Sequence, residues 1–233
     1  MKKRVLLIIP AYNEEANILK VCKSIIKDGR YDYIVINDGS TDKTEAICKS
    51  NKLNHISLVH NLGIGGAVQT GYKYAYEKGY DIAIQLDGDG QHSVKCVEDI
   101  IEPIIKGKTN MVIGSRYIEE KSEFKSTKAR QLGIKIISVV IKLVTGKKIY
   151  DTTSGFRAVD KDIIKYFSQN YPLEYPEPVS TVEVLRMKKI VSEIAVEMNE
   201  REGGISSIKA WKTIYYMINV IFSIIVTSLR RYK

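Results

Sequence analysis

The sequence predicts an α/β protein built on a mostly parallel sheet flanked by helices. Short apolar runs rich in β-branched residues alternate with longer stretches of helical periodicity, and turn residues follow most of the apolar runs. Of the 233 residues, 44% are hydrophobic and 27% are charged. These proportions are typical of a folded globular domain and exclude a disordered, collagen-like or multi-span membrane protein.

Each apolar run is predicted to be a strand and each periodic stretch a helix. The expected strands are Val5–Ile9, Tyr33–Ile36, Ile56–Val59, Ile82–Leu86, Met111–Ile113 and a later one near Val191–Met198. The expected helices are Glu14–Lys27, Asp42–Ser50, Gly66–Lys78, Val94–Lys106, Leu132–Val144 and a long C-terminal one. After residue 150 the regular alternation stops.

The residues that directly follow the strands are expected to form one cleft, because parallel strands end at the same edge of a sheet. They are Pro10–Glu14, Asp38, Asn61–Gly66, Asp87–Gln91 and Gly114–Tyr117. Asp38, at a strand end, can accept a hydrogen bond from a nucleobase. Turn and cap chemistry is the alternative interpretation of these Asn, Asp, Gly and Ser residues.

Segment 85–92, QLDGDGQH, brings two carboxylates to the end of a buried strand. Their charge is costly there unless something compensates it. A divalent cation that bridges a diphosphate is the natural compensation, because Mg²⁺ and Mn²⁺ prefer hard oxygen ligands. The glycines of the segment let the backbone turn so that Asp87, Asp89 and Gln91 converge. A solvated Asp-Gly turn is the alternative.

The net charge of +9 is unevenly distributed. Segment 121–150 holds eight basic side chains and one acidic, and segment 205–233 holds five basic and no acidic ones. Such segments usually meet phosphate, either of nucleic acid or of an anionic membrane. The cysteines Cys22, Cys48 and Cys96 show no CxxC spacing, which indicates a reducing cytosol rather than a disulfide framework.

Taken together, the motifs resemble those of family 2 glycosyltransferases of the GT-A fold, close to the polyprenyl-phosphate enzymes typified by dolichyl-phosphate mannose synthase. The matching motifs occur in family order and are PAYNEE at 10–15, VINDGSTD at 35–42, NLGIGGA at 61–67, QLDGDGQH at 85–92, GSRY at 114–117, DTTSGFRA at 151–158 and EREGGISSI at 200–208. The resemblance implies an inverting hexosyltransferase that uses a UDP- or GDP-linked sugar.

The resemblance also assigns roles to individual positions. The implied nucleotide-binding residues are Pro10, Ala11, Tyr12, Glu14, Asp38, Gly66 and Asp87. The implied ligands of Mg²⁺ or Mn²⁺ are Asp87, Asp89 and Gln91. On the acceptor side the implied residues are Arg116, Arg130, Ser154 and Arg157. Arg201 would close over the donor diphosphate and, with Asp89, Arg116 and Arg130, is expected to serve catalysis. For Arg157, a structural salt bridge to Asp151 is the alternative.

The C-terminal helix is expected to form a segment of its own, so that residues 1–204 are the catalytic domain and 205–233 a membrane-interface helix. Its stretch Thr213–Leu229 carries no charge and at about 1.5 Å per residue is shorter than the roughly 30 Å hydrocarbon core. A polar stripe along it lies opposite an apolar face, which is typical of an interfacial helix on an anionic membrane. Packing on the domain core and a short tilted span are the alternatives. The helix at Leu132–Val144 is a second candidate for membrane contact.

Three functions therefore remain open from the sequence. The first is sugar transfer to a polyprenyl phosphate by a protein on the cytoplasmic face of the cell membrane, with a separate small membrane protein as a conjectured partner. The second is transfer to a sugar hydroxyl in polysaccharide synthesis, which needs a general base such as Glu174 or Glu177. The third is a non-catalytic nucleotide-binding module. Nucleic acid is not an expected partner, because no aromatic-interleaved basic strand face is present.

Overall fold

The computed structural model describes residues 3–88, 96–118, 128–196 and 210–232, apart from the side chains of 128–130 and 210–214. The described residues form a seven-stranded sheet in the order β3-β2-β1-β4-β6-β5-β7. The strands are β1 (Val5–Ala11), β2 (Asp32–Asn37), β3 (His55–Ser57), β4 (Ile82–Gln85), β5 (Met111–Ser115), β6 (Arg157–Asp160) and β7 (Val191–Ala195).

The sheet is parallel except at β6, which pairs antiparallel with both β4 and β5. The predicted strands are all present, with ends shifted by a few residues, but β6 was not predicted. Its sequence RAVD has only two apolar residues between charged ones, so it lacks the apolar run that identifies a strand. The mostly parallel α/β class is therefore confirmed, with one antiparallel insertion.

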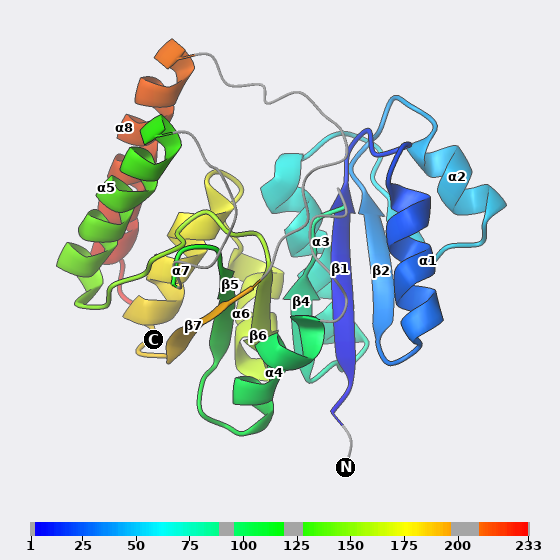
Figure 1. Cartoon of the computed structure of the whole chain (residues 1–233), viewed down its shortest axis with the longest axis horizontal. Helices are drawn as coiled ribbons and strands as arrows, with labels where there is room; N and C mark the ends of the chain where they lie inside the picture. Colours follow the sequence, from blue (N-terminus) through cyan, green and yellow to red (C-terminus); the bar gives the residue numbers. More distant parts are fainter. Residues whose placement is uncertain (1–2, 89–95, 119–127, 197–209, 233) are drawn as a thin grey trace.

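Helices cover both faces of the sheet (Figure 1). They are α1 (Ile18–Asp28), α2 (Thr44–Ser50), α3 (Gly63–Glu77), α4 (Val97–Ile105), α5 (Lys128–Thr145), α6 (Lys161–Asn170), α7 (Pro176–Arg186) and α8 (Ala210–Leu229). One buried cluster joins α1, α2 and α4 to one face. The other joins α3 and α5–α8 to the opposite face. The result is a three-layer α/β/α arrangement.

The C-terminal helix α8 packs against α5 and α7 (Figure 1). Val220 and Ile224 are buried in the core on this side. None of the described helices is long and apolar enough to cross a bilayer. The face of α8 that the sequence predicts to be apolar, including Ile218, Phe222 and Leu229, is exposed.

Candidate active site

A cavity of about 500 Å³ opens at the carboxyl ends of β1, β2 and β4. Its walls are Pro10, Ala11, Tyr12, Glu14, Asp38, Asn61, Gly63, Ile64, Ala67, Asp87 and Gly88. Six of the seven residues predicted to bind the nucleotide are on this list. The parallel topology explains the convergence, because β1, β2 and β4 are neighbours that all end at the same edge.

The loops after β1 and β2 are joined by reciprocal hydrogen bonds. The Asn13 N–H donates to Ser40 Oγ at 3.0 Å, and the Thr41 N–H donates back to Asn13 Oδ1 at 2.9 Å. The Glu14 N–H donates to Thr44 Oγ1 at 2.9 Å. Asn13 adopts a φ of 56°, a left-handed conformation that asparagine tolerates better than most residues. These bonds fix the backbone that carries Tyr12 and Glu14 into the cavity.

Asp38 is 2% exposed, yet its carboxylate lines the cavity. Its Oδ1 accepts a hydrogen bond from the Leu62 N–H at 2.7 Å, which ties the β2 loop to the start of α3. The next residue, Gly39, has a φ of 64°, and a Cβ there would lie 2.8 Å from the Asn61 nitrogen. Glycine is therefore required for Asp38 and α3 to approach each other.

The glycine-rich start of α3 approaches another segment of the protein itself. A Cβ on Gly65 would lie 2.5 Å from Leu173 Cα and Pro172 O. Gly66 was predicted to bind the nucleotide, but it is not a wall residue. A Cβ at Gly66 would meet Leu62, so this glycine is explained by packing within the helix start. Gly63 and Ile64, which belong to the segment Asn61–Gly66 expected in the cleft, line the cavity, and so does Ala67, which was not expected there.

Asp87 directly follows Leu86 beyond β4, is partly exposed and lines the cavity. Gly155 leaves room for its carboxylate, and Gly88 allows the loop after β4 to approach the loop after β1. A Cβ on Gly155 would lie 2.7 Å from Asp87 Oδ1, and a Cβ on Gly88 would lie 3.0 Å from Pro10 O. An oxygen ligand in a cradle that side chains would fill fits a small hard cation. Among the described residues, no group of three or more His, Cys, Asp or Glu side chains is placed so that it could hold a metal ion. The other predicted ligands, Asp89 and Gln91, lie outside them.

Arg116, just after β5, forms a buried ion pair. It is 6% exposed at the side chain and Asp151 is 0% exposed. Arg116 Nε and Nη2 donate to the two Asp151 oxygens at 2.7 and 2.8 Å, and Nη2 also donates to Thr153 Oγ1. Burial alone would lower the pKa of Arg116 and raise that of Asp151, but their mutual hydrogen bonds and charges reverse both shifts.

Arg157 does not pair with Asp151, contrary to the alternative drawn from the sequence. It is 1% exposed at the start of β6. Its Nε donates to the Ser154 carbonyl at 2.7 Å, and its Nη1 donates to the Glu177 carbonyl at 2.7 Å. Nη1 also reaches the hydroxyls of Ser180 and Thr181 on α7. Arg157 therefore joins the SGFR segment to the start of α7.

The two glutamates considered as a general base differ in position. Glu174 is exposed and lines a different cavity, between α6 and α8. Glu177 is partly buried near Arg157 and Asp87. Burial raises the pKa of Glu177, and the charge of Asp87 raises it further, against the lowering effect of Arg157. Among the remaining predicted residues, Ser154 is buried, and Arg201 and the side chain of Arg130 lie outside the described part of the chain.

A cavity at the carboxyl ends of parallel strands, with carboxylates in its walls, is where α/β proteins commonly bind their ligands. Residues 6–167 match the sequence profile of Glycosyl transferase family 2, and the chain belongs to that family of glycosyltransferases.

Two relatives illustrate the similarity. The UDP-N-acetylglucosamine–dolichyl-phosphate N-acetylglucosaminyltransferase of Methanococcus voltae is 34% identical over 204 residues, which cover 80% of this chain and 81% of that protein. The undecaprenyl-phosphate mannosyltransferase of Micrococcus luteus is 27% identical over 214 residues, covering 86% of each.

The fold is also found among solved structures. Glucosyl-3-phosphoglycerate synthase from Mycobacterium tuberculosis, crystallised with phosphoglyceric acid, superimposes with a TM-score of 0.72 at 19% sequence identity and covers 97% of this chain and 80% of that one. The same synthase crystallised with Mn²⁺, UDP and glucosyl-3-phosphoglycerate gives a TM-score of 0.71. The likeness confirms the GT-A fold.

Proposed function

We propose that the protein is an inverting glycosyltransferase that moves a sugar from a nucleotide-diphospho-sugar to a polyprenyl phosphate. The observation that carries this proposal is the convergence of Tyr12, Asp38 and Asp87 in one cavity of a family 2 glycosyltransferase. Relatives at 26–34% identity carry names that specify dolichyl, polyprenol or undecaprenyl phosphate as the acceptor. The proposal extends that acceptor class to this chain.

In the donor half of the site, the described residues would bind and orient the nucleotide. Tyr12 and Glu14, which follow the carboxyl end of β1, line the cavity. The buried Asp38 would accept a hydrogen bond from the nucleobase. Asp87, together with Asp89 and Gln91, would hold Mg²⁺ or Mn²⁺. The bound cation would neutralise charge on the leaving diphosphate. Arg201 would provide a second positive charge beside the same diphosphate.

The acceptor phosphate would not need a general base, since its second pKa is about 6 and it is mostly ionised near neutral pH. It would need cations that position one oxygen for in-line attack on the anomeric carbon, and Arg116 and Arg130 are proposed for this task. Asp151 and Thr153 accept hydrogen bonds from the Nε and Nη2 groups of Arg116 and hold the guanidinium in a fixed position, so Arg116 would act on the phosphate as a fixed positive charge. Ser154 and Arg157 would shape the same side. A single displacement inverts the anomeric configuration.

We further propose that residues 205–233 act with α5 as the membrane contact of the catalytic domain, residues 1–204. Leu132, Ile136, Val139 and Leu143 form an exposed apolar stripe on α5. Tyr215, Ile218, Phe222, Ile225 and Leu229 form another on α8. We call the two stripes together the two-helix face. Exposed apolar surface of this kind marks an interaction site.

The geometry of helix packing supports a single face. Gly133 of α5 lies against Met217 of α8, where a Cβ would be 3.2 Å from the sulfur. Leu132 of the α5 stripe precedes Gly133 by one residue, and Ile218 of the α8 stripe follows Met217 by one residue. The two helices run in the same direction in Figure 1. A step of one residue backward along α5 and one residue forward along α8 therefore turns the two side chains to the same side of the helix pair.

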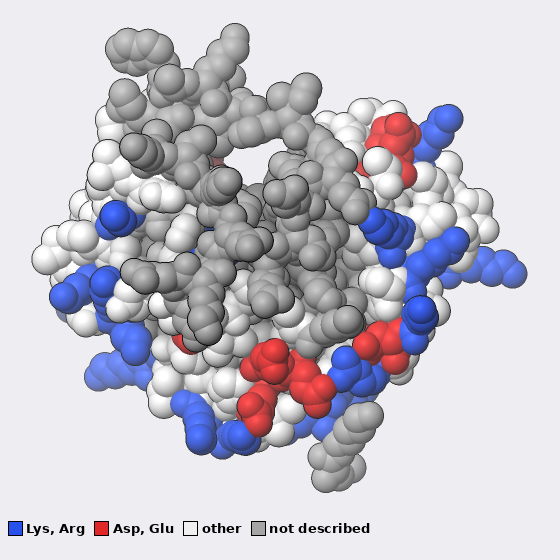
Figure 2. Space-filling view, in the orientation of Figure 1, with Lys and Arg blue, Asp and Glu red and all other residues white. Residues whose placement is uncertain are grey.

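The charges around the two-helix face suit an anionic cytoplasmic leaflet. Lys135, Lys142, Arg230 and Arg231 are exposed on the same helices or at their ends. In Figure 2, Lys and Arg side chains flank uncharged surface on the side where α5 and α8 lie in Figure 1. We therefore propose a peripheral protein on the cytoplasmic face of the membrane, where a small membrane protein could bind the same surface.

The proposed activity is tested by incubating the full chain with UDP- and GDP-linked sugars, a polyprenyl phosphate and Mn²⁺ or Mg²⁺. We expect a sugar–phosphate–lipid product that is lost on treatment with EDTA and restored by added cation. Activity that survives exhaustive EDTA treatment contradicts the metal role, and transfer only to sugar hydroxyls contradicts the acceptor.

The position of Glu177 favours hydroxyl transfer as the second candidate. A partly buried carboxyl group whose pKa is raised by burial, close to Asp87, has the properties of a general base. A Glu177→Gln variant separates the two candidates. If it transfers sugar to a polyprenyl phosphate as the wild type does, no base is needed there.

A further inference from the structure

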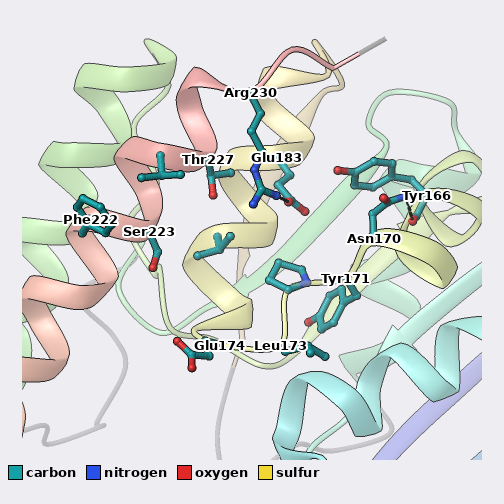
Figure 3. Close-up of a pocket in the computed structure, with 13 residues that line it drawn as sticks. Tyr166, Asn170, Tyr171, Leu173, Glu174, Glu183, Phe222, Ser223, Thr227 and Arg230 are labelled. Atoms are coloured by element: carbon teal, nitrogen blue, oxygen red, sulfur yellow. Dashed lines mark hydrogen bonds and ion pairs between the residues drawn. The ribbon is translucent and has the colours of Figure 1, made fainter.

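A second cavity, of about 400 Å³, lies between α6, α7 and α8 (Figure 3). It shares no wall residue with the nucleotide cavity. Its walls are Tyr166, Asn170, Tyr171, Pro172, Leu173, Glu174, Val179, Glu183, Phe222, Ser223, Val226, Thr227 and Arg230. The sugar transfer proposed above uses none of the charged groups in these walls.

Glu183, on α7, is the unusual member of this set. Its side chain is 2% exposed, and among the described residues Oε2 has no hydrogen-bond partner. Burying a carboxylate without full compensation is costly. In agreement, burial raises the pKa of Glu183 to about 7, even though Arg230 acts in the opposite direction.

Arg230, just beyond α8, compensates Glu183 only weakly. Its Nη1 lies 3.8 Å from Glu183 Oε1, beyond hydrogen-bond distance, and its side chain is 63% exposed. In Figure 3 the two side chains extend toward each other from different helices. The cavity thus contains a carboxylate and a guanidinium group that lie too far apart to form a hydrogen bond with each other.

The remaining walls favour an amine next to Glu183. Ser223 and Thr227, which carry hydroxyls, lie on α8. Tyr166 lies close enough to Glu183 for their charges to interact, and its aromatic ring can contact a cation. Phe222 also belongs to the exposed two-helix face, so the cavity borders the surface proposed to lie on the membrane.

We propose that this cavity binds a ligand in which a primary ammonium group lies close to a phosphate, as in phosphoethanolamine. The ammonium group pairs with the Glu183 carboxylate, and the phosphate pairs with Arg230. The ammonium group must carry N–H bonds, as a primary amine does, because the carboxylate accepts hydrogen bonds from a donor that a quaternary ammonium group lacks. The ligand is either a lipid head group or a free metabolite. The lipid as the source of the ligand depends on the proposed membrane contact. The binding of the ligand to the cavity does not depend on that proposal.

Calorimetric titration of the full chain with phosphoethanolamine tests the proposal without any sugar transfer. We expect binding that is roughly tenfold tighter than for inorganic phosphate or ethanolamine alone, the gain of one charge-assisted hydrogen bond. Glu183→Gln, which keeps the shape, should lose this preference for the amine, and the exposed Arg230→Ala should lose the preference for the phosphate. Asp162→Asn, on the exposed surface of α6, is the control, and circular dichroism reports that each variant is folded.

Vesicles distinguish the two sources of the ligand. At a constant fraction of phosphatidylglycerol, replacing phosphatidylcholine with phosphatidylethanolamine should strengthen binding of the wild type but not of Glu183→Gln if the source is a lipid. An effect of soluble phosphoethanolamine alone identifies a free metabolite. The proposal is overturned if the wild type binds phosphoethanolamine no better than inorganic phosphate, or if Glu183→Gln binds it equally well.

Discussion

The ion pair of Arg116 and Asp151 links stability to the proposed acceptor site. Asp151 accepts from the Arg116 backbone N–H at 3.1 Å as well as from the guanidinium, so the carboxylate fixes both the main chain and the side chain. The loop that carries Asp151 is itself held by Glu193 of β7, which accepts from the N–H groups of Tyr150 and Asp151. A change in any of these residues would alter the position of the arginine.

We predict that Arg116→Met lowers the free energy of unfolding by about 3–5 kcal/mol, because it leaves a buried carboxylate uncompensated. The double variant Arg116→Met with Asp151→Asn should recover a large part of that loss, since it removes the orphaned charge. Urea denaturation monitored by circular dichroism measures both. A single variant as stable as the wild type would show that the pair contributes nothing.

At the residue scale, the sequence predicted which residues line the cavity at β1, β2 and β4 better than it predicted which charged side chains pair with each other. Pro10, Asp38 and Asp87 each follow a strand, so topology alone brings them together. The pairing of Arg116 with Asp151 could not be predicted in this way. The two residues are 35 positions apart, and the sequence contains a second candidate, Arg157, closer to Asp151.

Gly65 gives a second test at the residue scale. A Cβ there would lie 2.5 Å from Leu173 backbone atoms, so Gly65→Ala must displace either the start of α3 or the segment before α7. Because Gly63 and Ile64 line the nucleotide cavity, we expect UDP affinity to fall by roughly tenfold or more, the equivalent of about 1.4 kcal/mol.

Gly133→Ala is the matched control for that variant. It is also a helical glycine, but its added Cβ would meet only the far end of the Met217 side chain at 3.2 Å, which can move. Calorimetric titration with UDP should give the wild-type affinity for this control. Equal UDP affinity for Gly65→Ala and the wild type would contradict the argument.

At the element scale, the antiparallel strand β6 and the two faces of α8 were the difficult features. β6 is held by its neighbours on both sides, and such tertiary pairing leaves no local pattern in four residues. For α8, the sequence presented interfacial contact and core packing as alternatives. The structure combines burial of Val220 and Ile224 with exposure of the opposite face, because apolar residues occur on both sides of this helix.

The contact between α7 and α8 should depend on pH through Glu183. Its pKa is raised from 4.5 to about 7 in the folded protein, so the folded state binds the proton more tightly than the unfolded state. The free energy of unfolding of the wild type, relative to that of Glu183→Gln, should therefore be greatest below pH 4.5. It should fall by about 3 kcal/mol as the pH rises through 7. Urea denaturation of both proteins across this range measures the difference.

Arg230→Ala is the control for the direction of that effect. The positive charge of Arg230 lowers the pKa of Glu183, so its removal should move the loss of stability to higher pH. A constant difference between wild type and Glu183→Gln at all pH values would show that Glu183 titrates at its ordinary pKa.

On the scale of the whole molecule, the proposed donor site and the two-helix face lie in different parts of one fold. The nucleotide cavity is formed at β1, β2 and β4, whereas α5 and α8 lie beyond β5 and β7 (Figure 1). Arg116, which is proposed for the acceptor side, follows β5, the strand that precedes α5 in the sequence. A lipid phosphate would thus meet the donor from the side on which the exposed apolar helices lie.

The last prediction concerns binding of the whole protein to membranes. Phe222→Glu combined with Leu143→Glu introduces two carboxylates into the two-helix face, where both native side chains are exposed. The fold should tolerate these changes, but the apolar contact is lost and the new charges are repelled by an anionic leaflet. We expect the wild type to sediment with phosphatidylglycerol vesicles, more weakly as salt rises because each basic residue contributes about 1 kcal/mol that salt screens. The double variant should remain in the supernatant at all salt concentrations and still bind UDP.

Ile26→Glu on α1, an exposed apolar residue away from this face, should sediment like the wild type. If all three proteins sediment equally, the two-helix face does not contact the membrane and another surface must bring the enzyme to its lipid acceptor.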